Sequence, residues 1–131
     1  MTRIRLPLLL RIDELLSGGR AVYNQPIITV EHVLPQNPSE LSQWLTDFPH
    51  APERERWVQK LANLVLLTRR KNSQASNFDF VEKKKYFAMK AGVANFAITS
   101  NVLKEKEWTV AVLERRQAEI LGAVAAVWRL D

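Results

Sequence analysis

The sequence contains no cysteine, only two histidines and only four glycines among its 131 residues. Without cysteine there can be no disulfide scaffold, no thiol catalysis and no thiolate zinc site, which leaves imidazole, carboxylate and amide groups for any metal. With His32 and His50 alone, a helical His-Glu-x-x-His pair is absent and a Ser-His-Asp triad has few ways to form. The glycines match neither of the common nucleotide-binding fingerprints.

Long apolar runs are absent as well. No stretch approaches the roughly 18–20 apolar residues that a membrane span needs. The leucines at positions 8–10 lie between charged residues, and Arg11, Asp13 and Glu14 cut short any segment typical of a signal peptide. We therefore expect a cytoplasmic protein with no membrane association. Lysine and arginine number 19 against 14 acidic residues, and the resulting net charge of +5 permits an anionic partner without requiring one.

The composition fits one globular domain over residues 1–131. Hydrophobic residues make up 47% of the chain and charged residues 25%, close to the average for folded proteins. A chain of this length can bury a core without a disulfide or a metal to support it. No internal repeat is visible, so we expect a single compact domain.

The spacing of apolar residues predicts a mostly helical α+β domain. Helices are expected over residues 8–16, 39–45, 52–61, 80–90 and 108–128, with Gly18 and Gly19 ending the first, Ser39 capping the second and Pro52 opening the third. Polar residues 69–77 suggest a further short helix. Residues 27–30 and 63–68 are short apolar runs that predict strands. The four tryptophans, which are Trp44, Trp57, Trp108 and Trp128, are expected to pack in the core.

The two histidines have different surroundings. His50 lies between Pro49 and Pro52 and is interpreted as an exposed loop residue. His32 follows Glu31 at the end of the first predicted strand. Such a pair, taken alone, is more often structural than catalytic. Successive side chains of a strand point to opposite faces, so Glu31 and His32 converge only if the strand ends or bends between them.

Four short motifs change this interpretation, because they occur in the order and at the spacing of one nuclease signature. They are Glu31-His32 with Pro35-Gln36, Asn63-Leu64 with Leu66-Leu67, Asn72-Ser73 with Ser76-Asn77, and Phe80 through Lys83 to Tyr86. Together they resemble the HNH, or ββα-metal (His-Me finger), nucleases. The closer resemblance is to the C-terminal HNH-like domain of GmrSD-type modification-dependent (type IV) restriction enzymes. Ala62 departs from the family's usual glycine, and Glu31 replaces the aspartate of many HNH nucleases.

The resemblance implies a ββα-metal finger embedded in a helical shell, acting as a divalent-metal-dependent DNA endonuclease in restriction and antiviral defence. It implies His32 as the general base that takes a proton from water. Glu31 and Asn72 would then hold Mg²⁺ or Mn²⁺, since these hard cations prefer oxygen ligands. Asn63 and Pro35 would support the site. The resemblance also implies a preceding N-terminal nucleotide-hydrolysing domain, which would make residues 1–131 the C-terminal fragment of a larger protein.

The basic residues are interpreted according to their distance from these motifs. Arg69, Arg70 and Lys71 directly precede Asn72, so we expect them to contact the DNA backbone. The lysines at 83–85 are expected to be solvated surface. An alternative remains open, namely a non-enzymatic domain of this fold that binds nucleic acid or a partner domain through its basic face. The combination of Glu31, His32 and Asn72 favours the enzyme, because binding alone does not require these residue types at these spacings.

Overall fold

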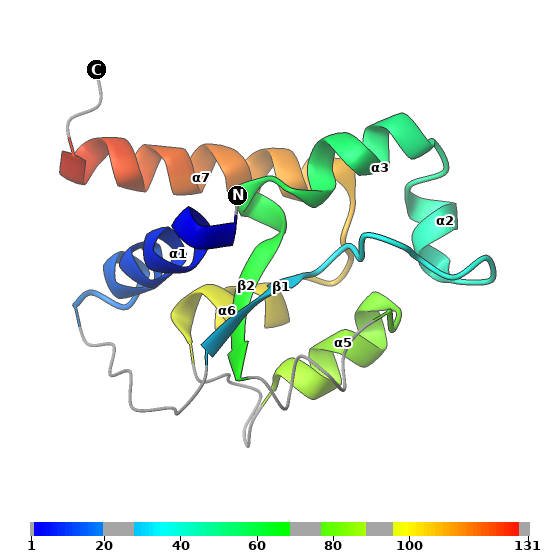
Figure 1. Ribbon diagram of the computed structural model, residues 1–131, viewed down its shortest axis with the longest axis horizontal. Coiled ribbons are helices and arrows are strands. Elements are labelled where there is room, and N and C mark those ends of the chain that lie inside the picture. The colour runs from blue at the N-terminus through cyan, green and yellow to red at the C-terminus, as the bar shows by residue number, and fades with distance from the viewer. Residues whose placement is uncertain (1, 20–27, 69–76, 89–95, 129–131) are drawn as a thin grey trace.

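The computed structural model describes residues 2–19, 28–68, 77–88 and 96–128 (Figure 1). The elements within these ranges are six α-helices, one 3-10 turn and two strands. In chain order they are α1 (Thr2–Leu16), β1 (Ile28–His32), α2 (Gln43–Asp47), α3 (Ala51–Val58), η1 (Leu61–Asn63), β2 (Leu64–Thr68), α5 (Phe80–Phe87), α6 (Ala97–Leu103) and α7 (Val110–Trp128). The predicted class, mostly helical α+β, is therefore confirmed. The ββα finger is not directly seen, because residues 69–76 lie outside the described ranges.

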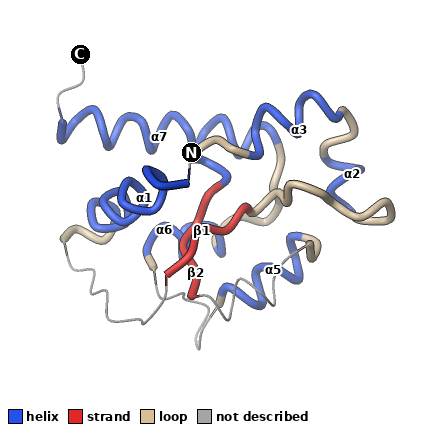
Figure 2. The backbone as a smooth tube through the Cα atoms, viewed as in Figure 1, coloured by secondary structure: helices blue, strands red, loops and turns tan. Residues whose placement is uncertain are grey.

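The two strands form an antiparallel pair at the centre of the molecule. Ile28 lies opposite Thr68 and His32 opposite Leu64. Both strands lie within one residue or two of where the sequence predicts them. The connection between them is long, and it carries α2, α3 and η1. Figures 1 and 2 show the pair between α1 and α7 on one side and α5 on the other.

β2 is apolar from Leu64 to Leu67, and these four residues are buried on both faces of the strand. Leu64 and Leu66 pack with Leu9 and Ile12 of α1 and with the apolar face of α7. The residues that alternate with them enter a second cluster, which contains aromatic side chains of α2, α3 and α5; they are Val65 and Leu67. Because neighbouring strand residues face opposite sides, this short strand separates two hydrophobic clusters.

Several predicted helix boundaries are correct, although α1 already begins at Thr2 and not at position 8. Gly18 and Gly19, both at positive φ (70° and 80°), end α1 as expected. The predicted C-terminal helix is present as α7, beginning two residues later than expected at Val110. Trp44, Trp57 and Trp108 are buried, as predicted for the core, and the side chain of Trp128 lies outside the description. Within the described ranges, no helix is both long and apolar enough to cross a membrane.

Other boundaries are wrong because tertiary contacts set them. The helix predicted over residues 39–45 begins only at Gln43, whose backbone N–H donates to the Asp79 carboxylate at 3.0 Å, so a distant side chain caps α2. The helix opened by Pro52 ends at Val58 and not at position 61. At this end the side-chain amide of Asn63 donates to the Val58 carbonyl at 3.0 Å. The helix predicted over 80–90 ends at Phe87 because Ala88 is extended. No helix was predicted for the segment that forms α6.

Candidate active site

His32 lies at the last residue of β1, opposite Leu64, and faces the side of the strand pair on which α1 packs. Its ring is half-buried. The ring Nε2 lies 3.2 Å from Oε1 of Gln59 and 3.5 Å from Nε2 of Gln36. On this side the ring borders a cavity of about 290 Å³, whose other lining residues are Arg5, Leu6, Ile28, Thr29 and Val30. The imidazole therefore reaches solvent from a mostly apolar wall that has one cationic side chain.

The surroundings of His32 keep its ring neutral near pH 7. Burial lowers the pKa of His32 below its ordinary value, and the hydrogen bond with Gln59 opposes this shift. The positive charges of Arg5 and Lys83 lower the pKa further. A neutral imidazole is the form that can accept a proton, so the electrostatics suit a general base.

Glu31 is buried on the opposite side of the strand pair. It lies opposite Val65, which packs in the cluster that includes Phe80 and Phe87 of α5. Its Oε2 is 3.1 Å from the ammonium of Lys83, and its Oε1 accepts the backbone N–H of His32 at 3.1 Å. Burial raises the pKa of Glu31 and lowers the pKa of Lys83, while the ion pair between them opposes both shifts.

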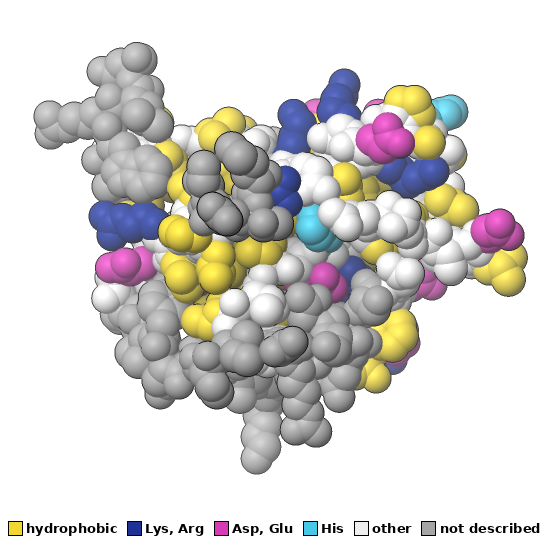
Figure 3. Space-filling model, viewed as in Figure 1, with side chains coloured by type: hydrophobic (Ala, Val, Ile, Leu, Met, Phe, Trp, Pro, Cys, Tyr) yellow, Lys and Arg dark blue, Asp and Glu magenta, His cyan; other side chains and the backbone are white. Residues whose placement is uncertain are grey.

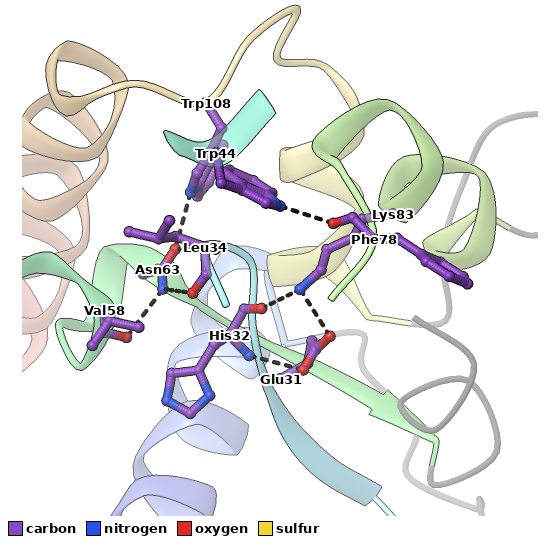
Figure 4. Close-up of polar contacts among 9 residues, drawn as sticks. All are labelled: Glu31, His32, Leu34, Trp44, Val58, Asn63, Phe78, Lys83 and Trp108. Atoms are coloured by element: carbon purple, nitrogen blue, oxygen red, sulfur yellow. Dashed lines mark hydrogen bonds and ion pairs between the residues drawn. The ribbon is translucent and has the colours of Figure 1, made fainter. Parts of the chain in front are cut away.

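Figure 4 shows the consequence for the two predicted site residues: the His32 ring and the Glu31 carboxylate point away from each other. Although the two residues are neighbours in sequence, the structure does not bring their functional groups together. Both Glu31 oxygens already accept a hydrogen bond from a protein donor, so a metal ion at this carboxylate would have to share it with Lys83. In the ranges that the structure describes, no group of three His, Asp or Glu side chains could hold a metal ion. Asn72 lies outside these ranges, so both ligand assignments stay predictions.

The side chain of Asn63 makes four hydrogen bonds from a fully buried position (Figure 4). Its Oδ1 accepts the Leu34 backbone N–H at 2.8 Å and the Trp108 indole N–H at 3.0 Å. Its Nδ2 donates to the carbonyls of Leu34 and Val58, each at 3.0 Å. The side chain thus ties the chain just after His32 to α3 and to the residues before α7, and none of its hydrogen-bonding groups is left for another ligand.

The remaining predicted site residues differ in how far they are described. Pro35 is buried and lines a hollow of about 310 Å³ together with Gln36 and Arg54. The expected DNA-backbone residues lie outside the described ranges; they are Arg69, Arg70 and Lys71. The expectation that the lysines at 83–85 form solvated surface is wrong for Lys83, which is 0% exposed. It holds for Lys85, which is exposed and pairs with Glu82 at 3.1 Å.

Sequence reasoning missed three residues that contact or influence His32. Lys83 could have been found, because it lies within the last of the four motifs, but its positive charge favoured a position on the solvent-exposed surface. Gln59 and Arg5 could not have been found in this way, since only the folding of α3 and α1 against the strand pair brings them near the ring. His50 is exposed as predicted.

The comparison with known families agrees with the motifs. The chain is a restriction endonuclease domain. It belongs to the family described as "GmrSD restriction endonucleases, C-terminal domain", whose sequence model matches residues 2–123, nearly the whole chain. The resemblance drawn from the four motifs is thereby confirmed. No curated protein and no solved structure is significantly similar to the chain.

Proposed function

We propose that this domain is the DNA-cleaving module of a restriction and antiviral defence enzyme, and that it hydrolyses phosphodiester bonds with a divalent metal ion. The observation that carries the proposal is the His32 ring, which is neutral, half-buried and open to a cavity beside Arg5. Membership in a restriction endonuclease family supports the same reaction.

In this proposal His32 takes the proton from the attacking water. In the tautomer with the proton on Nε2, this N–H donates to Oε1 of Gln59 at 3.2 Å, and Nδ1 is left as the basic nitrogen. Arg5, on the same cavity wall, supplies positive charge for the phosphate. A bound Mg²⁺ or Mn²⁺ would neutralise charge that develops on the phosphate oxygens. The resemblance assigns this ion to Glu31 and Asn72. The basic residues that directly precede Asn72 are the expected contacts to the DNA backbone; they are Arg69, Arg70 and Lys71.

The direct test is a plasmid-nicking assay with Mg²⁺ or Mn²⁺, with EDTA as the metal-free control. We expect nicking in the presence of either metal and its loss in EDTA. The same assay is run on a second preparation, the full-length protein, which would include the nucleotide-hydrolysing domain that the resemblance implies. DNA binding without metal-dependent cleavage in both preparations would favour the alternative, a binding domain with the same fold.

The lowered pKa of His32 predicts how cleavage depends on pH. Because the folded protein disfavours the protonated ring, the basic form persists below the ordinary histidine pKa of about 6.5. The rate should therefore remain high at pH 6.5 and fall at more acidic pH. A profile of kcat/KM at saturating metal checks this, and an acid limb centred above about 6.5 would contradict it.

Arg5 and Arg11 lie on the same helix and offer a matched comparison. Arg11 pairs with Glu14 at 3.4 Å on the exposed side of α1, whereas Arg5 lines the cavity beside His32. Arg5→Ala should weaken DNA binding and reduce the slope of log affinity against log salt by about 1, as for one lost phosphate contact. Arg11→Ala should change neither. Equal salt slopes for the two variants would show that Arg5 makes no phosphate contact.

A further inference from the structure

Lys83 is the one lysine of the run at 83–85 whose ammonium is fully buried. The run lies on α5, and its members have different surroundings: Lys84 is partly buried and donates to the Glu105 carbonyl at 2.9 Å, and Lys85 pairs with Glu82 at the surface. Lys83 alone reaches the strand pair. Taking an ammonium out of water is costly unless it is paired and hydrogen-bonded, so this burial needs a specific reason.

The ammonium of Lys83 contacts the His32 backbone directly and also contacts the carboxylate of Glu31 (Figure 4). Its Nζ donates to the His32 carbonyl at 2.6 Å and to Oε2 of Glu31 at 3.1 Å. The other Glu31 oxygen accepts the His32 backbone N–H at 3.1 Å. The ion pair therefore holds both polar groups of the His32 backbone, one through each partner. The strand is thus fixed at the residue whose ring faces the cavity.

We infer that Lys83 is a positioning residue of the proposed nuclease site, which acts with Glu31 to fix the His32 backbone so that the ring faces the cavity. This inference rests on the proposed function, since it concerns the same site. Glu31 is then the ion-pair partner of Lys83 and not a metal ligand. The placement of Glu31 and His32 on opposite sides of the strand pair agrees with this assignment, because a metal at Glu31 would lie on the far side of the strand from the ring.

The two histidines allow a test that does not depend on cleavage. Their imidazole signals can be followed together by NMR in the intact chain, with His50 as the internal reference. Lys83→Met removes the ammonium and keeps most of the side-chain volume. It should shift or split the His32 signals and leave those of His50 unchanged. Lys83→Arg, which retains the charge, should restore much of the parental spectrum. Lys85→Met, the matched surface control, should move neither histidine.

Cleavage kinetics give the second measurement. A base displaced by about 1 Å can lose a factor of up to about 100, so we expect Lys83→Met and Glu31→Gln each to lower kcat by about 10–100-fold. Neither should change KM for DNA or the Mn²⁺ concentration that gives the half-maximal rate. Lys83→Met leaves Glu31 buried without its partner, so the neutral double variant Lys83→Met/Glu31→Gln is measured beside it. It should fold and lose no more activity than the single variants.

The outcomes separate this inference from the proposed function. If no metal supports cleavage by the parent protein but Lys83→Met still displaces the His32 signals, the nuclease proposal fails and the positioning contact stands. If the parent cuts DNA and the His32 signals are unchanged in folded Lys83→Met, the inference fails alone. It also fails if Glu31→Gln raises the half-maximal Mn²⁺ concentration while Lys83→Met cuts at the parental rate, because Glu31 would then be a metal ligand.

Discussion

Replacing His32 by alanine is expected to slow DNA cleavage by a factor of about 10²–10⁴, the usual contribution of a general base. The loss should appear in kcat, because the ring accepts a proton from water and does not hold the duplex. The fold should survive. The ring is only half-buried, and its contacts are two glutamine side chains at 3.2 and 3.5 Å, on the exposed side of the strand end. The backbone at this position stays bonded to Glu31 and Lys83.

His50→Ala is the matched control for this prediction. His50 precedes α3 at an exposed position and makes no side-chain capping bond there. Figure 3 shows histidine side chains at separate places on this face of the molecule. His50→Ala should cut at the parental rate, and added Mn²⁺ should not rescue His32→Ala, since the missing group is a base. Folded His32→Ala that cuts like the parent would end the HNH interpretation of this chain.

The fold was predictable wherever a single segment carries its own signal. β2 is an example, because a run of leucine and valine too short for a helix implies a strand buried on both faces. The paired glycines after α1 and the apolar stripe of α7 are equally local signals. The start of α2 could not be predicted, since its first N–H is capped by Asp79 from a segment 36 residues away in sequence. From the sequence alone, Ser39 was a residue suited to cap this helix, and so the helix was predicted to begin there.

The candidate site divides in the same way. The motifs located His32, Glu31 and Asn63 in sequence, but they did not give the side of the strand pair that each faces. That depends on the register, in which Glu31 lies opposite Val65 and His32 opposite Leu64. A shift by one residue would exchange their faces. The burial of Lys83 was also hidden, because a lysine between two other lysines resembles surface until its acceptor is known.

Asn63→Ala should have the largest effect on stability. The substitution leaves four buried groups without their partner, namely the N–H and C=O of Leu34, the C=O of Val58 and the indole N–H of Trp108. Each buried group left unpaired costs about 1–3 kcal/mol, and partial relaxation of the loop recovers some of the sum. We expect the free energy of unfolding to fall by about 3–5 kcal/mol, a large part of the 5–15 kcal/mol typical of a domain. Urea denaturation measures this loss.

A comparison of two tryptophans measures the contribution of one of these four hydrogen bonds, the one from Trp108 to Asn63. Trp108 and Trp57 are both buried in the same cluster and both have cations over their rings. Arg116 lies 5.0 Å from the Trp108 ring, and Lys60 and Arg56 lie 4.8 and 5.8 Å from the Trp57 ring. The two tryptophans differ at the indole N–H, which donates to Asn63 in Trp108 and has no partner among the described residues in Trp57. Replacement by phenylalanine removes the same volume at both positions, so Trp108→Phe should destabilise the protein by about 1–2 kcal/mol more than Trp57→Phe. Equal losses would mean that the bond from Trp108 to Asn63 adds nothing to stability. The network would then depend on the backbone contacts of Asn63 at Leu34 and Val58.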